Sequence, residues 1–375
     1  MSSIPFNKPF FTGQEFAYMR QALESGHVSG DGRFTRDAEV QLTSIIGGAR
    51  HLLTPSCTAA LEMAALLLDI APGDEVICPA FTFVSSVNAF VLRGARPVFA
   101  DIRPDTLNVD ETQIESLITS RTKAIIVVHY AGVGCEMDAI MSLADRRGIP
   151  VIEDNAHGLL GKYRGRALGS FGRFATESFH ETKNITCGEG GALTINRVAD
   201  VERAEIIREK GTDRSRFFRG QVDKYTWTDL GSSFLLSDLL AACLLAQLEK
   251  REVIQARRRA IWNAYDDRLA GWAKSVGARP PVIPSHCEQA FHMFHLLMPS
   301  LEFRQRLIAH LKAAEILAVF HYLPLNRSPM ARRLGAGNDC PVTDDVSDRL
   351  LRLPFYLDLG PDDQRRVIDR IVNFC

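Results

Sequence analysis

The stretch Lys123–Asp154, KAIIVVHYAGVGCEMDAIMSLADRRGIPVIED, decides the fold of this chain. It begins with the apolar run Lys123–His129, continues through a helical pattern that ends at Gly148, and closes with a second apolar run, Ile149–Asp154. Apolar runs of this length are typical of buried parallel strands, and a glycine commonly follows the last turn of a helix. The stretch is therefore predicted to be a strand–helix–strand unit.

Similar apolar runs, such as Glu75–Pro79 and Arg96–Ala100, alternate with helical patterns from about residue 50 to residue 200. This alternation predicts an α/β fold in which helices cover a parallel sheet. Ligands of such sheets bind beyond the carboxyl ends of the strands. Three polar residues are expected along this rim: His129, Asp154 and His157.

The chain has 375 residues, more than one typical core accommodates, so two domains are expected. Residues 235–272 have the pattern of one or two long helices that bridge these domains. Short apolar strands and helices alternate after residue 280, which favours a smaller α+β domain. We expect a large domain with an N-terminal arm at residues 1–245 and a small C-terminal domain at residues 246–375.

The charge balance argues for small-molecule partners. The 44 basic residues nearly cancel the 45 acidic ones, so no strong field would attract nucleic acid or an anionic membrane. The first residues, MSSIPFNK, do not have the basic region followed by an apolar run that is typical of a secretion signal, and no apolar run is long enough to span a membrane. The eight cysteines are scattered, with no metal-ligand spacing. We therefore expect a cytoplasmic protein with reduced cysteines and no metal.

Lys183 is the first candidate for chemistry. It lies in the run SFHETKN, residues 178–184, which is followed by GEGG, and it is downstream of the strand that ends at Asp154. An amine among small and hydroxylated residues can hold an aldehyde cofactor as a Schiff base, which indicates pyridoxal phosphate. A lysine by itself is more often a solvated surface charge, so the interpretation depends on the residues around it.

A helical run that begins with SCTAAL, residues 56–61, is a candidate phosphate site. Small and hydroxylated residues at a helix N-terminus expose free backbone N–H groups, and the helix dipole favours a negative charge there. An ordinary serine or threonine cap is the simpler interpretation of this motif alone. The hydroxyl of Ser178, five residues before Lys183, favours a shared phosphate site.

Asp154 ends a strand that is expected to be buried, where an unpaired carboxylate is unfavourable and needs a cation. The protonated ring nitrogen of pyridoxal phosphate is one such cation, and a structural salt bridge is the alternative. His157 could bond the phenolic oxygen of the cofactor, and Phe83 could stack on its ring. Either residue could equally be structural.

Taken together, these motifs resemble the DegT/DnrJ/StrS sugar aminotransferases, which are pyridoxal-phosphate enzymes. The resemblance runs nearly from end to end. It implies the aspartate aminotransferase fold (fold type I), with a mostly parallel central sheet and a smaller α+β C-terminal domain. The motifs that carry it are SCTAALEMAALLLD, PAFTFVSS, DIRPDTLNVD, VIEDNAHG, SFHETKN and GEGGA.

The resemblance also implies residue roles. Lys183 would form the Schiff base and move a proton between cofactor and sugar, and Asp154 would pair with the ring nitrogen. The remaining cofactor contacts would come from Thr58, Ala59 and Ser178 at the phosphate, Phe83 on the ring face, and His157 where many relatives have glutamine.

Sites of this family lie at a dimer interface, so the resemblance implies a homodimer with shared active sites. The neighbouring subunit would supply the segment that contains Lys224, Tyr225 and Ser233. His321 and Tyr322 are the candidates for contact with the sugar nucleotide.

The likeness is closest to members that transfer an amino group from L-glutamate to C4 of a dTDP-linked 4-keto-6-deoxy sugar for surface polysaccharides. Three regions carry it: residues 207–233, 129–138 and 318–325. Besides His157, two positions depart from the family pattern. Ser233 stands where many relatives have an asparagine that reaches the phosphate, and Asn326 replaces a histidine. Asn326 leaves open an aminotransferase that acts on a different keto-sugar nucleotide.

Other function classes fit the residues less well. A non-catalytic or regulatory relative that binds the cofactor stays open, although Lys183 and Asp154 are both present. Dehydratases of the same fold carry histidine in place of the lysine. A nicotinamide-dependent enzyme would need GxGxxG after a strand, and the nearest match, GDGRFT at residues 30–35, lacks the final glycine.

Overall fold

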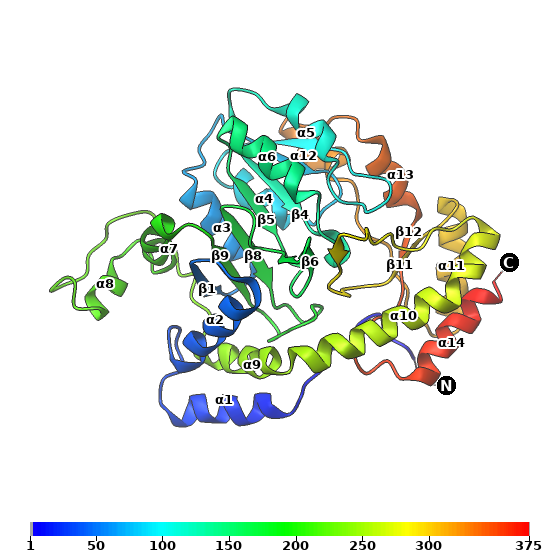
Figure 1. Ribbon diagram of the computed structural model, residues 1–375, viewed down its shortest axis with the longest axis horizontal. Coiled ribbons are helices and arrows are strands. Elements are labelled where there is room, and N and C mark those ends of the chain that lie inside the picture. Colours follow the sequence, from blue (N-terminus) through cyan, green and yellow to red (C-terminus); the bar gives the residue numbers. More distant parts are fainter. Residues whose placement is uncertain (1–2, 375) are drawn as a thin grey trace.

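The computed structural model describes residues 3–374 and contains a central sheet of seven strands in the order β1-β9-β8-β5-β4-β2-β3 (Figure 1). Only β9 runs antiparallel to its neighbours, so the predicted α/β fold with a mostly parallel sheet is confirmed. The strands are β1 (Arg50–Thr54), β2 (Glu75–Pro79), β3 (Arg96–Ala100), β4 (Thr122–Val128), β5 (Val151–Asp154), β8 (Phe174–Ser178) and β9 (Gly191–Ile195).

Helices cover both faces of this sheet. Successive side chains of a strand point to opposite faces, so Val76 and Cys78 join one hydrophobic cluster while Ile77 joins another. The first cluster includes the helices α3 (Cys57–Leu67), α4 (Ser85–Val91) and α7 (Val201–Arg208), and the second includes α5 (Glu111–Leu117) and α6 (Met137–Arg147).

The strand–helix–strand unit predicted from residues 123–154 is present as β4, α6 and β5. Helix α6 ends at Arg147, and Gly148 after it has a φ of 66°, the left-handed conformation that glycine adopts without a steric penalty. Strands β4 and β5 pair in parallel, and Val128 lies opposite Asp154. The acidic end of β5 is therefore at the carboxyl edge of the sheet.

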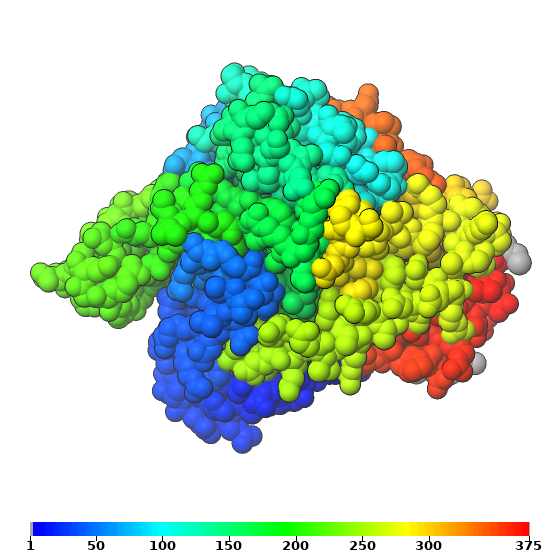
Figure 2. All heavy atoms as spheres, in the orientation of Figure 1, coloured from blue at the N-terminus to red at the C-terminus, as the bar shows by residue number. Residues whose placement is uncertain are grey.

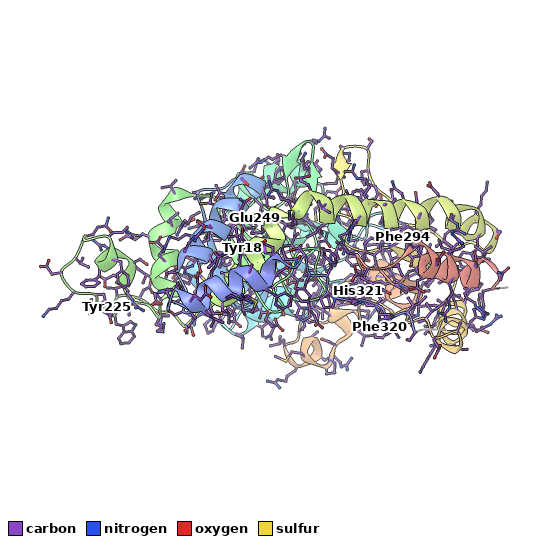
Figure 3. All side chains as sticks on the ribbon, turned by 90° about the horizontal axis from the view of Figure 1, so that it is seen from below. Tyr18, Tyr225, Glu249, Phe294, Phe320 and His321 are labelled. Atoms are coloured by element: carbon purple, nitrogen blue, oxygen red, sulfur yellow. The ribbon has the colours of Figure 1, made fainter. Side chains whose placement is uncertain are left out.

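A second hydrophobic core lies in the C-terminal half and includes Tyr265 and Phe294, of which Phe294 is labelled in Figure 3. The predicted helical region 235–272 is two helices that meet at Lys250, α9 (Asp238–Glu249) and α10 (Arg251–Val276). The other elements of this half are β10 (Cys287–Glu288), β11 (His295–Leu297), α11 (Leu301–Ala313), α12 (Pro329–Arg333), α13 (Pro341–Arg349), β12 (Leu350–Arg352) and α14 (Pro361–Val372).

The N-terminal segment contacts both halves. Ile4 is buried in the C-terminal core and pairs with Ile316, whereas α1 (Gln14–Glu24) and α2 (Arg33–Ile46) pack on α9. The hydroxyl of Tyr18 on α1 donates a 2.9 Å hydrogen bond to Glu249 on α9 (Figure 3). The division of the chain after residue 245 stays a prediction.

Helix α8 (Arg214–Phe218) and the loop that follows it project away from the rest of the molecule (Figures 1 and 2). We call residues 214–230 the arm. Its aromatic side chains are largely in solvent: Phe218 is 70% exposed and Trp227 76%. None of the helices in residues 3–374 has both the length and the apolar character needed to cross a membrane.

Candidate active site

A cavity of about 640 Å³ lies where the carboxyl edge of the sheet meets the C-terminal half. A larger cavity, of about 790 Å³ between α10 and β10, contains none of the predicted site residues. The 640 Å³ cavity, which we call the active-site cavity, brings together Thr58, Phe83, Asp154, His157, Ser178, Lys183, His321 and Tyr322.

Asp154 reaches this cavity from the last position of β5 and is only 5% exposed. Its Oδ2 accepts a 2.6 Å hydrogen bond from Ser86, and its Oδ1 accepts one from the backbone N–H of Ala156. No cationic side chain of residues 3–374 lies within ion-pair distance of this carboxylate. A buried anion without a counterion favours a cationic ligand, such as a protonated pyridine nitrogen.

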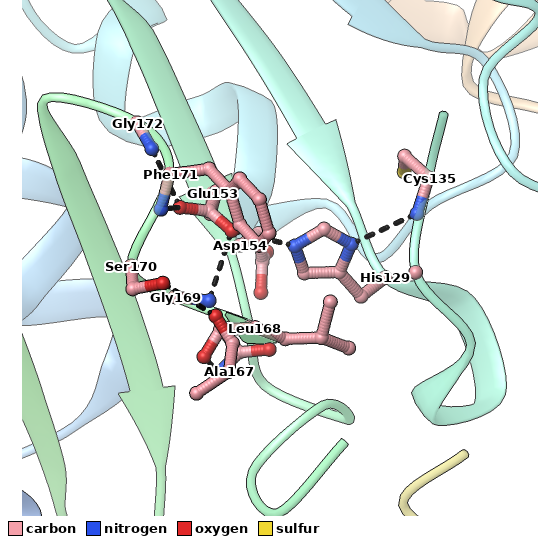
Figure 4. Close-up of polar contacts among 12 residues, drawn as sticks. His129, Cys135, Glu153, Asp154, Ala167, Leu168, Gly169, Ser170, Phe171 and Gly172 are labelled. Carbon is pink, nitrogen blue, oxygen red and sulfur yellow. Dashed lines mark hydrogen bonds and ion pairs between the residues drawn. The ribbon is translucent and has the colours of Figure 1, made fainter. Parts of the chain in front are cut away.

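The neighbouring Glu153 points away from the cavity, as alternation along a strand requires. Its carboxylate accepts hydrogen bonds from the backbone of Gly169, Phe171 and Gly172, and it lies 2.9 Å from Nε2 of His129 (Figure 4). His129 therefore belongs to this buried cluster. His129 does lie at the predicted rim, where its backbone N–H donates to the carbonyl of Asp154, but it does not line the cavity with Asp154 and His157, because its ring turns to the opposite face of the sheet.

Lys183 lies in a tight turn after β8, where its backbone N–H donates to the carbonyl of His180. Burial lowers the pKa of the Lys183 ammonium, and the charge of Arg352 lowers it further. Cys57 and Asp154 act in the opposite direction. The net result is an amine that loses its proton more readily than an ordinary lysine does.

Helix α3 begins at the edge of the cavity. The Ser56 hydroxyl caps the helix by accepting a 3.1 Å hydrogen bond from the N–H of Ala59, and Thr58 donates to Ser85. Ala59 does not line the cavity. Gly191 of β9 lies against this helix start, and a Cβ there would be 2.4 Å from the backbone nitrogen of Cys57. The hydroxyls of Thr58 and Ser178 thus line a helix N-terminus that suits an anion.

His157 stacks on His292, with ring centroids 4.1 Å apart and an interplanar angle of 15°. Burial holds the pKa of His157 well below its usual range, so the imidazole is neutral. Its Nδ1 is buried and has no hydrogen-bond partner within the described chain. A buried polar atom of this kind fits a ligand that carries a phenolic oxygen.

His321 and Tyr322 enter the cavity from the C-terminal half, in the stretch before α12. Nδ1 of His321 lies 3.0 Å from the hydroxyl of Tyr130, and burial holds the pKa of His321 well below its usual range. The ring of Tyr322 lies 6.2 Å from that of Phe83. Phe83 itself is 57% exposed, so a face of its ring is free to cover a ligand.

The structure does not bring Lys224, Tyr225 and Ser233 to the cavity of their own chain. Lys224 and Tyr225 belong to the arm, and Figure 3 shows Tyr225 near one end of the molecule, well away from His321 and Phe320. Ser233 pairs with Glu209 beside the base of the arm. Asn326, which departs from the family pattern, is buried, donates to the carbonyl of Asn338 and does not line the cavity.

Sequence reasoning missed three residues of this site: Ser86, His292 and Arg352. The hydroxyl-rich run PAFTFVSS, residues 79–86, was a signal for Ser86. His292 and Arg352 come from the C-terminal half and line the same cavity. Neither residue stands out locally, because one histidine or one arginine beside a short apolar strand is unremarkable in sequence.

Solved structures match this architecture over nearly the whole chain. The aminotransferase TlmJ from Streptoalloteichus hindustanus is 28% identical, with a TM-score of 0.91, 99% of this chain covered and 98% of that one. A candidate sugar aminotransferase, Spr1654 from Streptococcus pneumoniae, was crystallised in a PMP form, which is 28% identical at a TM-score of 0.91 with 98% of both chains covered. PseC from Helicobacter pylori, an aminotransferase of pseudoaminic acid biosynthesis, is 25% identical, with a TM-score of 0.90, 99% of this chain covered and 98% of that one.

These matches confirm the predicted fold class, that of the pyridoxal-phosphate aminotransferases of fold type I. The sequence model of the DegT/DnrJ/EryC1/StrS aminotransferase family matches residues 11–372. The match covers almost all of the chain, including every residue that lines the cavity between Thr58 and Phe355. The chain belongs to the DegT/DnrJ/EryC1/StrS aminotransferase family.

Proposed function

We propose that this protein transfers an amino group from L-glutamate to C4 of a 4-keto-6-deoxy sugar nucleotide. The substrate that fits best is dTDP-4-dehydro-6-deoxy-D-glucose, and the product is dTDP-4-amino-4,6-dideoxy-D-galactose, as the likeness to dTDP-4-amino-4,6-dideoxygalactose transaminase implies. One observation carries the proposal: the readily deprotonated amine of Lys183 and the unpaired carboxylate of Asp154 line the same cavity.

The predicted cofactor, pyridoxal 5'-phosphate, is confirmed for this family, because Spr1654 was crystallised in both PLP and PMP forms. The residues of the cavity fit this group. Asp154 would pair with the ring nitrogen, His157 would bond the phenolic oxygen and Phe83 would cover a ring face, since all three line the cavity. Thr58 at the start of α3 and the hydroxyl of Ser178 at the end of β8 would hold the phosphate. Ala59, which the resemblance also assigns to the phosphate, does not line the cavity, and its N–H already donates to Ser56. When bound, the cofactor supplies an electron-withdrawing ring next to the reacting carbon.

The protein groups then divide the work. Lys183 moves a proton at its Nζ, and its lowered pKa brings that proton transfer closer to neutral pH. Asp154 is oriented by hydrogen bonds from Ser86 and from the N–H of Ala156, and in this orientation it would pair with a ring nitrogen. His157 stays neutral and so adds no second positive charge beside Lys183. On this proposal, His321 and Tyr322 contact the sugar nucleotide.

The arm favours a homodimer with shared sites. Its aromatic side chains are largely exposed, although Phe217 contacts Phe218 and Tyr225. Tyr225 also lies well away from His321, which lines the cavity (Figure 3). We propose that a second subunit inserts this segment, with Ser233 reaching the cofactor phosphate. Mixing Lys183→Ala and Tyr225→Ala subunits should then restore part of the activity that each variant lacks, because one of the two sites in each heterodimer regains both residues.

The decisive experiment is incubation of the protein with pyridoxal phosphate, L-glutamate and a panel of keto-sugar nucleotides, with mass spectrometry of the products. The proposal expects an amino sugar from dTDP-4-dehydro-6-deoxy-D-glucose and loss of the product in Lys183→Ala. Lys162→Ala is a matched control, since Lys162 is a surface lysine that pairs with Glu288. If only a different keto sugar were aminated, the proposed substrate would be wrong. If no sugar were aminated, the alternative of a non-catalytic relative that binds the cofactor would be favoured.

A further inference from the structure

Tyr130 contacts His321 from outside the active-site cavity. It follows β4 in the short helical turn Tyr130–Gly132, and its backbone N–H donates a 2.8 Å hydrogen bond to Oδ1 of Asn108. The side chain of Tyr130 is 1% exposed and does not line the cavity, whereas His321 does. The ring of Tyr130 packs against Phe81, with ring centroids 5.3 Å apart. Backbone and ring contacts therefore hold the hydroxyl in one place.

The hydroxyl of Tyr130 has one hydrogen-bond partner among residues 3–374, which is Nδ1 of His321 at 3.0 Å. Burial raises the pKa of the Tyr130 phenol, and it holds the pKa of His321 well below its usual range. Both groups are therefore neutral. A single proton lies between the oxygen and the nitrogen, and it belongs to one of them.

The surroundings of the two groups decide which atom carries this proton. If Nδ1 carried it, the proton of the hydroxyl would be buried without an acceptor in the described chain, which is unfavourable. If the hydroxyl donates to Nδ1, both atoms are satisfied, and the neutral imidazole carries its own proton on Nε2. Within residues 3–374, Nε2 of His321 forms no hydrogen bond and is not enclosed by protein. An N–H donor is therefore left for a ligand in the cavity.

We propose that Tyr130 fixes His321 as an N–H donor to an uncharged oxygen at or next to the reacting carbon of the sugar. This inference rests on the proposed function and adds a positioning residue to it, since Tyr130 acts only through His321. A neutral imidazole does not balance the charge of a carboxylate or a diphosphate. Its N–H group suits a keto or hydroxyl oxygen.

The position of His321 agrees with this role. Its ring stacks on that of His157, with ring centroids 6.1 Å apart and an interplanar angle of 29°. His157 is the residue proposed to bond the phenolic oxygen of the cofactor, and in pyridoxal phosphate that oxygen is next to the carbon that exchanges the amino group. The donor of His321 is therefore expected at the reacting end of the sugar, across the ring from the diphosphate at C1.

The first test determines the tautomer directly in the holoenzyme. When the histidine rings are labelled with 15N, the nitrogen chemical shifts distinguish a protonated ring nitrogen from an unprotonated one. The signals of His321 are those that disappear in His321→Ala or, if that variant does not fold, in His321→Gln. We expect the proton on Nε2 in the wild-type protein. A proton on Nδ1 would overturn the proposal.

The second test measures kcat/KM for each substrate, because in a two-stage amino transfer this ratio reports on the half-reaction of that substrate alone. Tyr130→Phe removes only the hydroxyl, so the ring of His321 is free to rotate or to take the other tautomer. We expect kcat/KM for dTDP-4-dehydro-6-deoxy-D-glucose to fall about 3- to 10-fold, the range for one neutral hydrogen bond, and that for glutamate to fall less than about 2-fold. Tyr265→Phe is the matched control, since Tyr265 is also buried and donates one hydrogen bond, to the carbonyl of Pro354.

A double-mutant cycle separates positioning from a general structural effect. If Tyr130 acts through His321, Tyr130→Phe should have no further effect on kcat/KM in the His321→Ala background. An effect of the same size in both backgrounds would overturn the proposal, and so would equal losses for the sugar and for glutamate. Failure of the proposed function is a different result, in which the wild-type protein aminates no keto sugar while the nitrogen shifts still show the tautomer.

Discussion

The hydroxyl of Ser86 donates a 2.6 Å hydrogen bond to Oδ2 of Asp154 and lies 2.8 Å from the hydroxyl of Thr82. The other oxygen of Asp154 accepts from the backbone N–H of Ala156. Both carboxylate oxygens are thus fixed by the protein itself, so the orientation of Asp154 does not depend on a ligand. A preoriented charge stabilises a cationic group without the cost of reorganisation.

Loss of this hydrogen bond should therefore reduce activity without loss of the fold. We expect Ser86→Ala to lower kcat about 10-fold, and Asp154→Asn to lower it by about 100-fold or more, because the second change removes the charge itself. Steady-state kinetics of amino-sugar formation would measure both, and Ser142→Ala on the exposed surface of α6 is the matched control. Wild-type kcat in folded Asp154→Asn would exclude the proposed role of that residue.

The pH at which the apoprotein captures pyridoxal phosphate should report on Lys183. Capture needs the free amine, so the lowered pKa predicts that the capture rate reaches its plateau at a lower pH than for a free lysine side chain. Asp154 raises this pKa and Arg352 lowers it. The midpoint should therefore move to lower pH in Asp154→Asn and to higher pH in Arg352→Met.

The measurement is the rate of the absorbance change after mixing apoprotein with the cofactor at a series of pH values. Nα-acetyl-lysine amide provides the reference, because titration of the cofactor itself affects its reaction rate and that of the protein equally. Shifts of both variants in one direction would contradict the charge arrangement described for this cavity.

Glu153 is predicted to be important for stability rather than for chemistry. Its carboxylate accepts from three backbone N–H groups and from His129, all of them in the interior (Figure 4). Glu153→Ala leaves those donors unpaired and should lower the free energy of unfolding by about 4 kcal/mol. Glu153→Gln keeps the shape and one acceptor, so it should cost less. Urea unfolding followed by circular dichroism would measure both, and a change of less than about 1 kcal/mol in Glu153→Ala would contradict this account.

Glu177 is predicted to make the folded state less stable as the pH rises. It is fully buried, and burial raises the pKa of its carboxyl well above the usual range, with the charges of Glu153 and Asp154 adding to the effect against a hydrogen bond from Asn155. Above about pH 4.3 the unfolded chain releases this proton while the folded chain retains it, so the contribution of Glu177 to stability falls as pH rises.

Glu177→Gln cannot titrate, so the difference in unfolding free energy, variant minus wild type, should increase from about pH 4 to about pH 8. Urea unfolding of both proteins at several pH values measures this difference, from which the other titrating groups largely cancel. A difference that stays constant with pH would show that Glu177 is ionised in the folded protein.

The sequence predicted those parts of the site that local patterns encode. The strand–helix–strand unit of residues 123–154, the start of α3 and Lys183 all have signals within a few residues of themselves. The side chain of His129 was misplaced because the rule for parallel sheets locates the edge of the sheet but not the direction of each side chain. Successive residues of a strand point to opposite faces of the sheet, so a shift of one residue decides whether a side chain enters the cavity or lies on the opposite face with Glu153.

The remaining residues depend on chain pairing over long distances. Arg352 reaches the cavity only because β12 pairs with β11 and with Val319, and His292 only because its ring stacks on His157. The single break at Lys250, which divides residues 235–272 into α9 and α10, likewise carries no proline or glycine in the sequence. Tertiary packing determines such features, and one sequence does not display them.

The absence of a side chain at Gly191 determines how closely β9 approaches the start of α3, where the phosphate is proposed to bind. The backbone of Gly191 passes so close to Ser56 and Cys57 that any side chain would have to displace the first turn of α3. Saturation mutagenesis at this codon should therefore return glycine alone among functional clones, even though residue 191 does not itself line the active-site cavity. Because residue 191 has a hydrogen atom where alanine would have a methyl group, the first turn of α3 can lie directly against β9. This contact fixes the position of the helix N-terminus at which the phosphate is proposed to bind.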